Sequence, residues 1–162
     1  MRRLSGKDRR FDKLDRAVPF WGLSLSSYDN FGYLDLVTDA ENRVTDVDFN
    51  ELGWLIQQKN PLGYLTKYSH DENGNVKKLE RQADLGATVW QTTDFTYDIL
   101  NNLKTVMDPL NRPTTYNYDN NENLQSVVDA ENHTTSYEYD ERDLLFKIKD
   151  ANTPQGVTQY DY

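Results

Sequence analysis

Two histidines, many carboxylates and eleven tyrosines are the residues of this chain whose types could support catalysis or ligand binding. A metal or acid–base site needs several such groups held close together. His70 and His133 lie in distant segments, each at a position that comparable segments fill with tyrosine or an ordinary residue. The chain has no cysteine, and the motifs of serine hydrolases, zinc proteases and P-loops do not occur. We therefore predict no enzyme, no catalytic residue and no cofactor.

The carboxylates do not single out a reactive pair. A glycosidase needs two carboxyl groups fixed about 5–10 Å apart in a cleft, and the recurring aspartates here are turn residues. The segment Asp46-Val47-Asp48-Phe49-Asn50 is similar to the start of a calcium loop. Its sixth position is Glu51 instead of glycine, and its twelfth is Gln57 instead of glutamate. We predict no metal site.

A stripe of tyrosines is the remaining candidate binding surface. Alternate residues of a strand share a face, so Tyr116 aligns with Tyr118, and Tyr137 with Tyr139. Stacked tyrosine faces can bind sugars, which makes these four residues a candidate carbohydrate-binding site. The competing interpretation, which we favour, is that these tyrosines pack and form hydrogen bonds within a sheet.

The elements that position these residues follow a repeat. The pattern formed by Tyr97-Asp98, Leu103, Val106, Asp108, Asn111, Thr114 and Tyr116 recurs 21 residues later. A fixed period of this length is typical of a repeat architecture. Repeats are predicted to start at Tyr28, Phe49, His70, Tyr97, Tyr118, Tyr139 and Tyr162, with spacings of 21, 21, 27, 21, 21 and 23 residues. We predict an irregular segment with a degenerate repeat over residues 1–27 and an array of about six repeats over 28–162.

Each repeat contains two turn signals. One lies in segments such as Asp108-Pro109-Leu110-Asn111, and the other follows the Tyr-Asp pair, as in Asp29-Asn30-Phe31-Gly32. Asp or Asn at the first turn position can accept a bond from the backbone two residues on, and Gly or Asn at the fourth tolerates a left-handed conformation. Two turns in 21 residues leave about six residues for each of two strands. The sequence therefore predicts an all-β array of tandem β-hairpins, with the extra residues at 82–89 in a lengthened hairpin.

The charge distribution excludes some partners. The formal net charge is −9, although residues 1–16 hold seven Lys and Arg against three Asp. An acidic body argues against nucleic acid, because phosphate contacts need clustered basic residues. We interpret the basic start as a solvated terminus instead of an anion-binding arm. No apolar run approaches the length of a membrane span, and no signal peptide is visible.

The repeat pattern resembles the YD repeat of the RHS-repeat family, which includes Tc-toxin shells and teneurin-like shells. The motif positions that carry the resemblance, and that we assign to a structural role, are Tyr28, Asp29, Tyr97, Asp98, Tyr118, Asp119, Tyr139 and Asp140. The sequence departs from the pattern at Phe49-Asn50 and His70-Asp71. It also has Asn101, Glu122 and Asp143 where the family usually has glycine. We therefore expect the later repeats to turn differently.

The resemblance implies a curved, elongated antiparallel sheet that forms a partial arc of an RHS-type β-shell. It further implies a non-catalytic segment that encapsulates or displays a toxin or effector domain, in a protein that is secreted or at the cell surface. Expected partners are other YD repeats or such a cargo. The alternative is an adhesion or carbohydrate-binding β-repeat module with glycans as ligands. Because an array of this kind has two open sheet edges, we also expect self-association.

Overall fold

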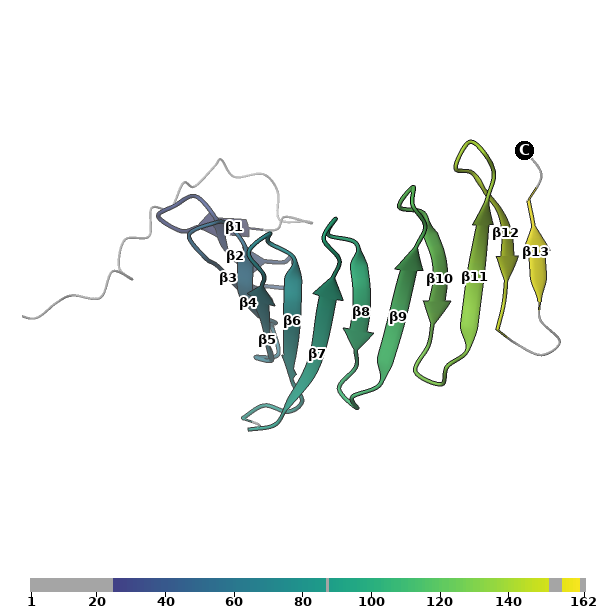
Figure 1. The fold of residues 1–162 in the computed structure, drawn as a ribbon. Coiled ribbons are helices and arrows are strands. Elements are labelled where there is room, and N and C mark those ends of the chain that lie inside the picture. Colours follow the sequence, from purple (N-terminus) through teal and green to yellow (C-terminus); the bar gives the residue numbers. More distant parts are fainter. Residues whose placement is uncertain (1–24, 87, 152–155, 161–162) are drawn as a thin grey trace, which may run out of the picture.

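The chain forms one antiparallel sheet. The structure, a computed structural model, describes residues 25–86, 88–151 and 156–160. Within these residues there is no helix, and thirteen strands pair in chain order from β1 to β13 (Figure 1). The strands are β1 (Leu25–Tyr28), β2 (Leu34–Thr38), β3 (Val44–Phe49), β4 (Leu55–Lys59), β5 (Leu65–His70), β6 (Val76–Gln82), β7 (Trp90–Tyr97), β8 (Leu103–Met107), β9 (Pro113–Tyr118), β10 (Leu124–Val128), β11 (Thr134–Tyr139), β12 (Leu145–Lys149) and β13 (Val157–Gln159). The predicted all-β hairpin array is confirmed.

The hairpins are closed by one repeated turn. In the turn that starts at Asp98, the Asn101 N–H donates to the Asp98 carbonyl oxygen (3.1 Å), and the Asp98 N–H donates to the Asn102 carbonyl oxygen (2.9 Å). Asn101 has a φ of 68°, in the left-handed region. This arrangement is a type I turn followed by a left-handed residue, a common three-residue hairpin loop. The equivalent left-handed residues are Gly32, Asn42, Gly53, Gly63, Gly74, Asn111, Glu122, Asn132 and Asp143.

The later repeats turn in the same way as the early ones. Glu122 has a φ of 67° and Asp143 a φ of 58°, close to the values of the asparagines at equivalent positions. The expectation that they would turn differently was wrong. The hydrogen bonds of the aspartate at the start of each turn hold the backbone in this conformation even where the side chain does not favour it.

Glu122 therefore carries backbone strain that a substitution can remove. A left-handed conformation costs a non-glycine residue roughly 1 kcal/mol, and asparagine tolerates it better than glutamate. We expect Glu122→Asn to stabilise the chain by about 1 kcal/mol, measured as a higher midpoint of urea unfolding. Asn132→Gln, which places a long side chain at a left-handed position, is the converse variant and should destabilise it. An unchanged midpoint for both variants would contradict this explanation.

A β-bulge accompanies each described turn at a repeat start, called here a Tyr-Asp turn even where the start is Phe49-Asn50 or His70-Asp71. In the β9–β10 hairpin, Leu124 pairs with Tyr118 and Ser126 with Asn117, which leaves Gln125 as the extra residue. The corresponding residues in the other hairpins are Asp35, Ile56, Lys77, Lys104 and Phe146. A bulge bends its strand and increases the local twist. Bulges at the same place in successive hairpins favour a curved sheet, and Figure 1 shows β1–β5 turning away from the plane of β7–β13.

The two faces of the sheet differ. Paired residues of neighbouring strands lie on the same face, so Tyr118 and Leu124 share a face, as do Tyr116 and Val127. The opposite face carries polar pairs such as Asn117–Ser126, whose side chains form a 3.0 Å hydrogen bond. No described residue is fully buried. Among the described residues, the apolar face is half-buried by contacts along the sheet, as expected for a single sheet.

The extra residues of the 27-residue unit lie in the β6–β7 hairpin. β6 and β7 have seven and eight residues, while the other described strands have three to six. The extra residues therefore lengthen both strands of this hairpin as well as its connection, as predicted. Tyr162 and residues 1–24, which include the basic segment and the degenerate repeat, lie outside the described residues, and the boundary between 1–27 and 28–162 remains a prediction.

Candidate functional site: the Tyr-Asp positions of the repeat

The tyrosine of each late repeat contacts the preceding hairpin. The Tyr118 hydroxyl donates to the Leu103 carbonyl oxygen (3.0 Å), and the Tyr139 hydroxyl donates to the Leu124 carbonyl oxygen (3.0 Å). Tyr97 makes the equivalent bond to the carbonyl of Val76 (2.9 Å). In each case the acceptor follows the turn at the preceding repeat start, which for Tyr97 is His70-Asp71. These hydroxyls therefore connect successive hairpins.

The electrostatic surroundings keep these hydroxyls protonated. Burial, and next the charge of Asp98, raise the pKa of Tyr118. Burial, and next the charge of Asp71, do the same for the pKa of Tyr97. A protonated hydroxyl is the form that donates to a carbonyl, so the raised pKa and the hydrogen bond agree.

The aspartate of each repeat holds its turn. Oδ1 of Asp98 accepts from the backbone N–H groups of Leu100 (2.8 Å) and Asn102 (2.9 Å). The same two bonds are made by the residue at the start of ten described turns, including the asparagines Asn50 and Asn60. The others are Asp29, Asp39, Asp71, Asp98, Asp108, Asp119, Asp129 and Asp140. A carboxylate occupied in this way serves the backbone and is not presented to a substrate.

The hydrogen bonds to these aspartates predict acid sensitivity. The backbone N–H of Asn102 lowers the pKa of Asp98, the Arg112 guanidinium lowers that of Asp108, and the Arg142 guanidinium lowers that of Asp140. A lowered folded-state pKa gives stability that is present above the unfolded value, about 3.9, and lost as the pH falls through the folded value. We expect the melting temperature to drop steeply below about pH 4, measured by circular dichroism at a series of pH values. Equal stability at pH 2 and pH 6 would contradict this expectation.

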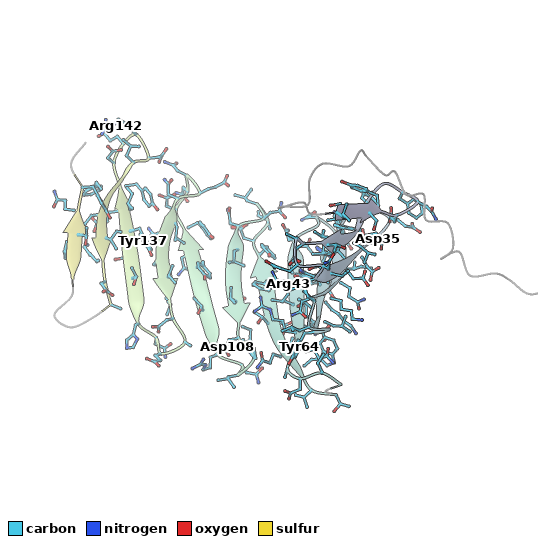
Figure 2. The ribbon with its side chains drawn as sticks, turned by 180° about the vertical axis from the view of Figure 1, so that it is seen from behind. Asp35, Arg43, Tyr64, Asp108, Tyr137 and Arg142 are labelled. Atoms are coloured by element: carbon cyan, nitrogen blue, oxygen red, sulfur yellow. The ribbon has the colours of Figure 1, made fainter. Side chains whose placement is uncertain are left out.

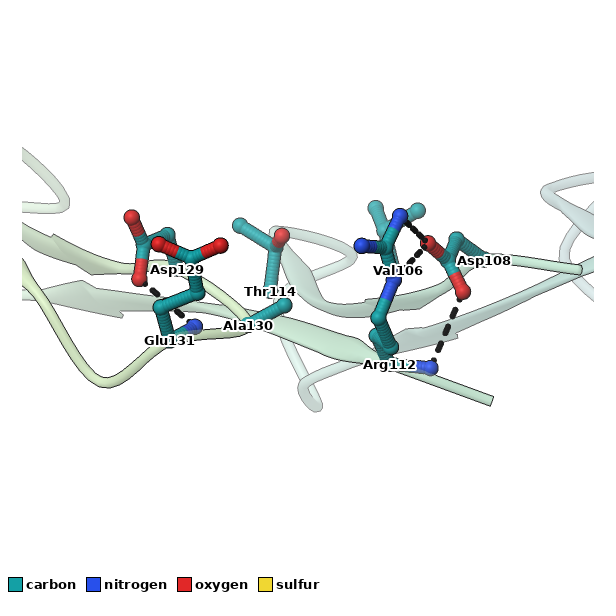
Figure 3. A pocket seen from close by; sticks show the side chains of 7 residues that line it. All are labelled: Val106, Asp108, Arg112, Thr114, Asp129, Ala130 and Glu131. Atoms are coloured by element: carbon teal, nitrogen blue, oxygen red, sulfur yellow. Dashed lines mark hydrogen bonds and ion pairs between the residues drawn. The ribbon is translucent and has the colours of Figure 1, made fainter. Parts of the chain in front are cut away.

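The turns at the other end of the strands border a shallow hollow lined by charged residues. Arg112 binds Asp108 (Nε to Oδ2, 2.8 Å), and Asp129 with Glu131 lies on the neighbouring turn (Figure 3). Figure 2 shows Asp108 and Arg142 at opposite ends of the strands, with Tyr137 between them. The hollow is shallow and its charges are already paired, so it offers little that would fix a substrate.

The histidines are placed as parts of the repeat. The His70 ring lies 5.4 Å from the ring of Trp54. His133 occupies a turn, where its Nδ1 lies 3.0 Å from Oδ2 of Asp129. The oxygens of the calcium-like segment are also engaged, since Asp48 accepts from Gln57 (3.0 Å) and Asn50 holds a turn. No cluster of metal-ligating side chains occurs among the described residues.

The four candidate sugar-binding tyrosines divide into two kinds. Tyr118 and Tyr139 use their hydroxyls to join hairpins. Within the described part of the chain, the hydroxyls of Tyr116 and Tyr137 make no hydrogen bond, and both rings are half-buried on the same face. The sequence analysis treated all four tyrosines alike. The signal that separates them is that only Tyr118 and Tyr139 are followed by aspartate.

Comparison with known families decides what this geometry belongs to. The profile of the teneurin YD-shell family matches residues 59–162, well over half of the chain. The chain belongs to the teneurin YD-shell family. The resemblance drawn from the repeat is thus confirmed. No curated protein matches the chain.

Solved structures show the same fold as this YD-shell chain. The Tc holotoxin pore of Photorhabdus luminescens is 16% identical, with a TM-score of 0.61, over 84% of this chain and 9% of that chain. The TcdB2–TccC3 complex is 17% identical, with a TM-score of 0.58, over 84% and 10%. The TcdB2–TccC3–Cdc42 complex is also 17% identical, with a TM-score of 0.54 over the same shares. The YD-shell chain therefore spans about a tenth of the length of these proteins, and at this identity the likeness concerns the fold alone.

The YD-shell chain contains no long apolar helix of the kind that crosses a membrane, as judged over residues 25–86, 88–151 and 156–160. Its tyrosines and aspartates together form hydrogen bonds within hairpins and between them. This arrangement holds successive hairpins of the described sheet together.

Proposed function

We propose that the chain is a non-catalytic segment of a shell wall, in a protein that encloses or displays a toxin or effector domain. The observation that carries the proposal is the single sheet in chain order, in which one hairpin is tied to the next by a tyrosine hydroxyl. A wall that grows by adding hairpins suits a container, because its size is set by the number of repeats. The named toxin complexes with the same fold support this role.

The energetics of the sheet agree with a wall. A lone hairpin is marginal in water, and no described residue here is fully buried. Each hairpin therefore depends on its neighbours for stability. A catalytic site would need groups held rigidly in a cleft, whereas at the shallow hollow Asp108 is paired with Arg112 and Asp129 accepts from the backbone N–H of His133.

Protection of a cargo tests the proposal. The complete polypeptide in which the chain occurs, co-expressed with the product of the adjacent reading frame, should retain a domain that resists protease at neutral pH. Lowering the pH through the lowered pKa values of the turn aspartates, well below about 4, should open the wall and expose that domain. A preparation in which every region outside the sheet is digested at neutral pH contradicts encapsulation.

The location and assembly of the protein follow from the same role. We propose that it acts outside the cell or at the cell surface. We also propose that it associates with itself through the edges at β1 and β13, whose described side chains are exposed. Light scattering of the isolated chain over a range of concentrations should show an increasing mass, and a constant monomer mass would contradict self-association.

An adhesion or carbohydrate-binding module is the second candidate. The observation in its favour is that Tyr116 and Tyr137 lie 21 residues apart on one face, half-buried, with hydroxyls not used by the described sheet. In this case binding on a glycan array should be lost in the Tyr116→Ala/Tyr137→Ala variant. Absence of glycan binding by the folded wild-type chain would remove this candidate.

A further inference from the structure

Successive Tyr-Asp turns contact each other through two positions. One is the left-handed residue of a turn, called here the αL residue, and the other is the residue after it, called αL+1. The αL+1 residue of one turn contacts the αL residue of the next Tyr-Asp turn along the sheet. Contacts of this kind join Tyr33 to Gly53, Trp54 to Gly74, Asn75 to Asn101 and Asn123 to Asp143.

Two early junctions combine an aromatic ring with a glycine. A Cβ placed on Gly74 would lie 3.0 Å from the Trp54 ring, and one on Gly53 would lie 3.1 Å from the Tyr33 ring. Both distances are shorter than ordinary van der Waals contacts. Any residue other than glycine at these αL positions must therefore displace the ring. A positive φ alone would also have admitted asparagine, so the ring explains why glycine is needed.

The same rings also contact the residues that stand where other repeats have their first tyrosine. The Tyr33 ring lies 5.7 Å from Phe49, and the Trp54 ring lies 5.4 Å from His70. Phe49 and His70 are the two repeat starts that lack tyrosine. A ring contact thus takes the place of the hydroxyl bond that joins hairpins elsewhere.

The late junctions use amides instead of rings. Asn75 Nδ2 donates to Asn101 Oδ1 (2.8 Å), and Asn123 Nδ2 donates to Asp143 Oδ1 (2.8 Å). In both cases a tyrosine, Tyr97 or Tyr139, starts the incoming repeat and donates to the carbonyl of the residue after the αL+1 asparagine. The Asn75–Asn101 junction spans the longest repeat unit, so the match depends on spatial contact and not on a constant sequence spacing.

We infer that the wall uses two junction chemistries that do not mix, and that they specify which hairpin can lie beside which. The ring junction needs an aromatic αL+1 residue, a glycine at the next αL position and a repeat start without a tyrosine hydroxyl. The amide junction has asparagine at αL+1 and a tyrosine start, with Asn101 or Asp143 accepting the amide bond at the next αL position. At the remaining tyrosine start, Tyr118, Asn102 is followed by Glu122 at the next αL position, and the Tyr118 hydroxyl bond makes the link. This specificity is distinct from the proposed cargo role, which would hold with either chemistry.

The hairpin of β5 and β6 is the point where the chemistry changes. On one side, Gly74 and His70 of this hairpin contact the Trp54 ring, as in the ring junction. On the other side, its Asn75 donates a hydrogen bond to Asn101, as in the amide junction. A hairpin with one side of each type is required wherever the two kinds of repeat meet.

An exchange of one whole junction tests the inference. Gly74→Asn alone should lower the melting temperature by roughly 4 °C or more, because its Cβ meets the Trp54 ring in addition to the backbone strain at a φ of +88°. Gly32→Asn is the matched control, with a φ of +87° and nothing within 4 Å of the added Cβ, and should change it by less than about 2 °C. Trp54→Asn and His70→Tyr should each lower it as well.

The triple variant Trp54→Asn/His70→Tyr/Gly74→Asn builds an amide junction in place of the ring junction. We expect its melting temperature to return to within about 2 °C of the wild type. Its tyrosine at position 70 should then resist ionisation at alkaline pH, as a bonded hydroxyl does. A triple variant that melts at the temperature given by adding the single effects, or that does not fold, overturns the inference, as does an equal effect of Gly74→Asn and Gly32→Asn.

Discussion

Replacing Asp98 by alanine is expected to lower the melting temperature of the chain by several degrees. The Asp98 carboxylate accepts from two backbone N–H groups, at Leu100 and Asn102, and its other oxygen accepts from the Asn102 side chain (3.3 Å). Alanine leaves those N–H groups without their partner. The turn then loses the bonds that hold its αL residue, Asn101, in the left-handed conformation. Because each hairpin pairs with the next, the loss weakens the sheet on both sides of the turn.

Asp98→Asn is the matched control for this prediction. Asparagine keeps the accepting oxygen, and Asn50 and Asn60 already hold two turns of the same chain in this way. Thermal unfolding followed by circular dichroism should show Asp98→Asn close to wild type and Asp98→Ala well below it. If both variants melt together, the carboxylate oxygen does not hold the turn.

Replacing Tyr118 by alanine is the second large effect. The ring is half-buried beside Leu124, and the hydroxyl bonds to the Leu103 carbonyl. Loss of a fully buried aromatic ring costs about 3–5 kcal/mol, so a half-buried one should cost about 2 kcal/mol. Tyr118→Phe removes the hydroxyl alone and should cost about 1 kcal/mol, the typical net contribution of one hydrogen bond.

Tyr116→Phe provides the control on the same strand and face. Its hydroxyl makes no hydrogen bond within the described residues, so its removal should change the free energy of unfolding by less than about 0.5 kcal/mol. Urea unfolding of the three variants gives the comparison. Equal effects of Tyr118→Phe and Tyr116→Phe would show that the hydroxyl does not join the hairpins.

The repeat made most of the fold predictable. Tyr118-Asp119 and its copies set the period, and the Asp and Asn residues of the turns set the hairpin ends, because each acts through local bonds that a short segment contains. Single-sheet architecture followed from strands of five or six residues between such turns. The alternation of Tyr116 and Tyr118 also placed both correctly on one face.

The features that were not predicted depend on contacts between hairpins. Gln125 looks like any polar strand residue, and only its pairing shows it to be a bulge. Glu122 suggested a different turn because glutamate disfavours the left-handed conformation. The hydrogen bonds that Asp119 accepts from the backbone outweigh this preference, and they are seen only in the structure. Phe49 and His70 looked like degenerate copies, whereas each contacts a ring from the previous turn. Only the three-dimensional arrangement brings these partners together.

Amide hydrogen exchange of Tyr118→Phe tests most directly whether the repeat tyrosines hold neighbouring hairpins together. If they do, exchange becomes faster in β8 and β9, on either side of the lost bond, while β2–β4 stay unchanged and Tyr116→Phe is indistinguishable from wild type. Exchange that is unaltered at β8 and β9, or that is raised equally along the whole sheet, would contradict this role of the tyrosines.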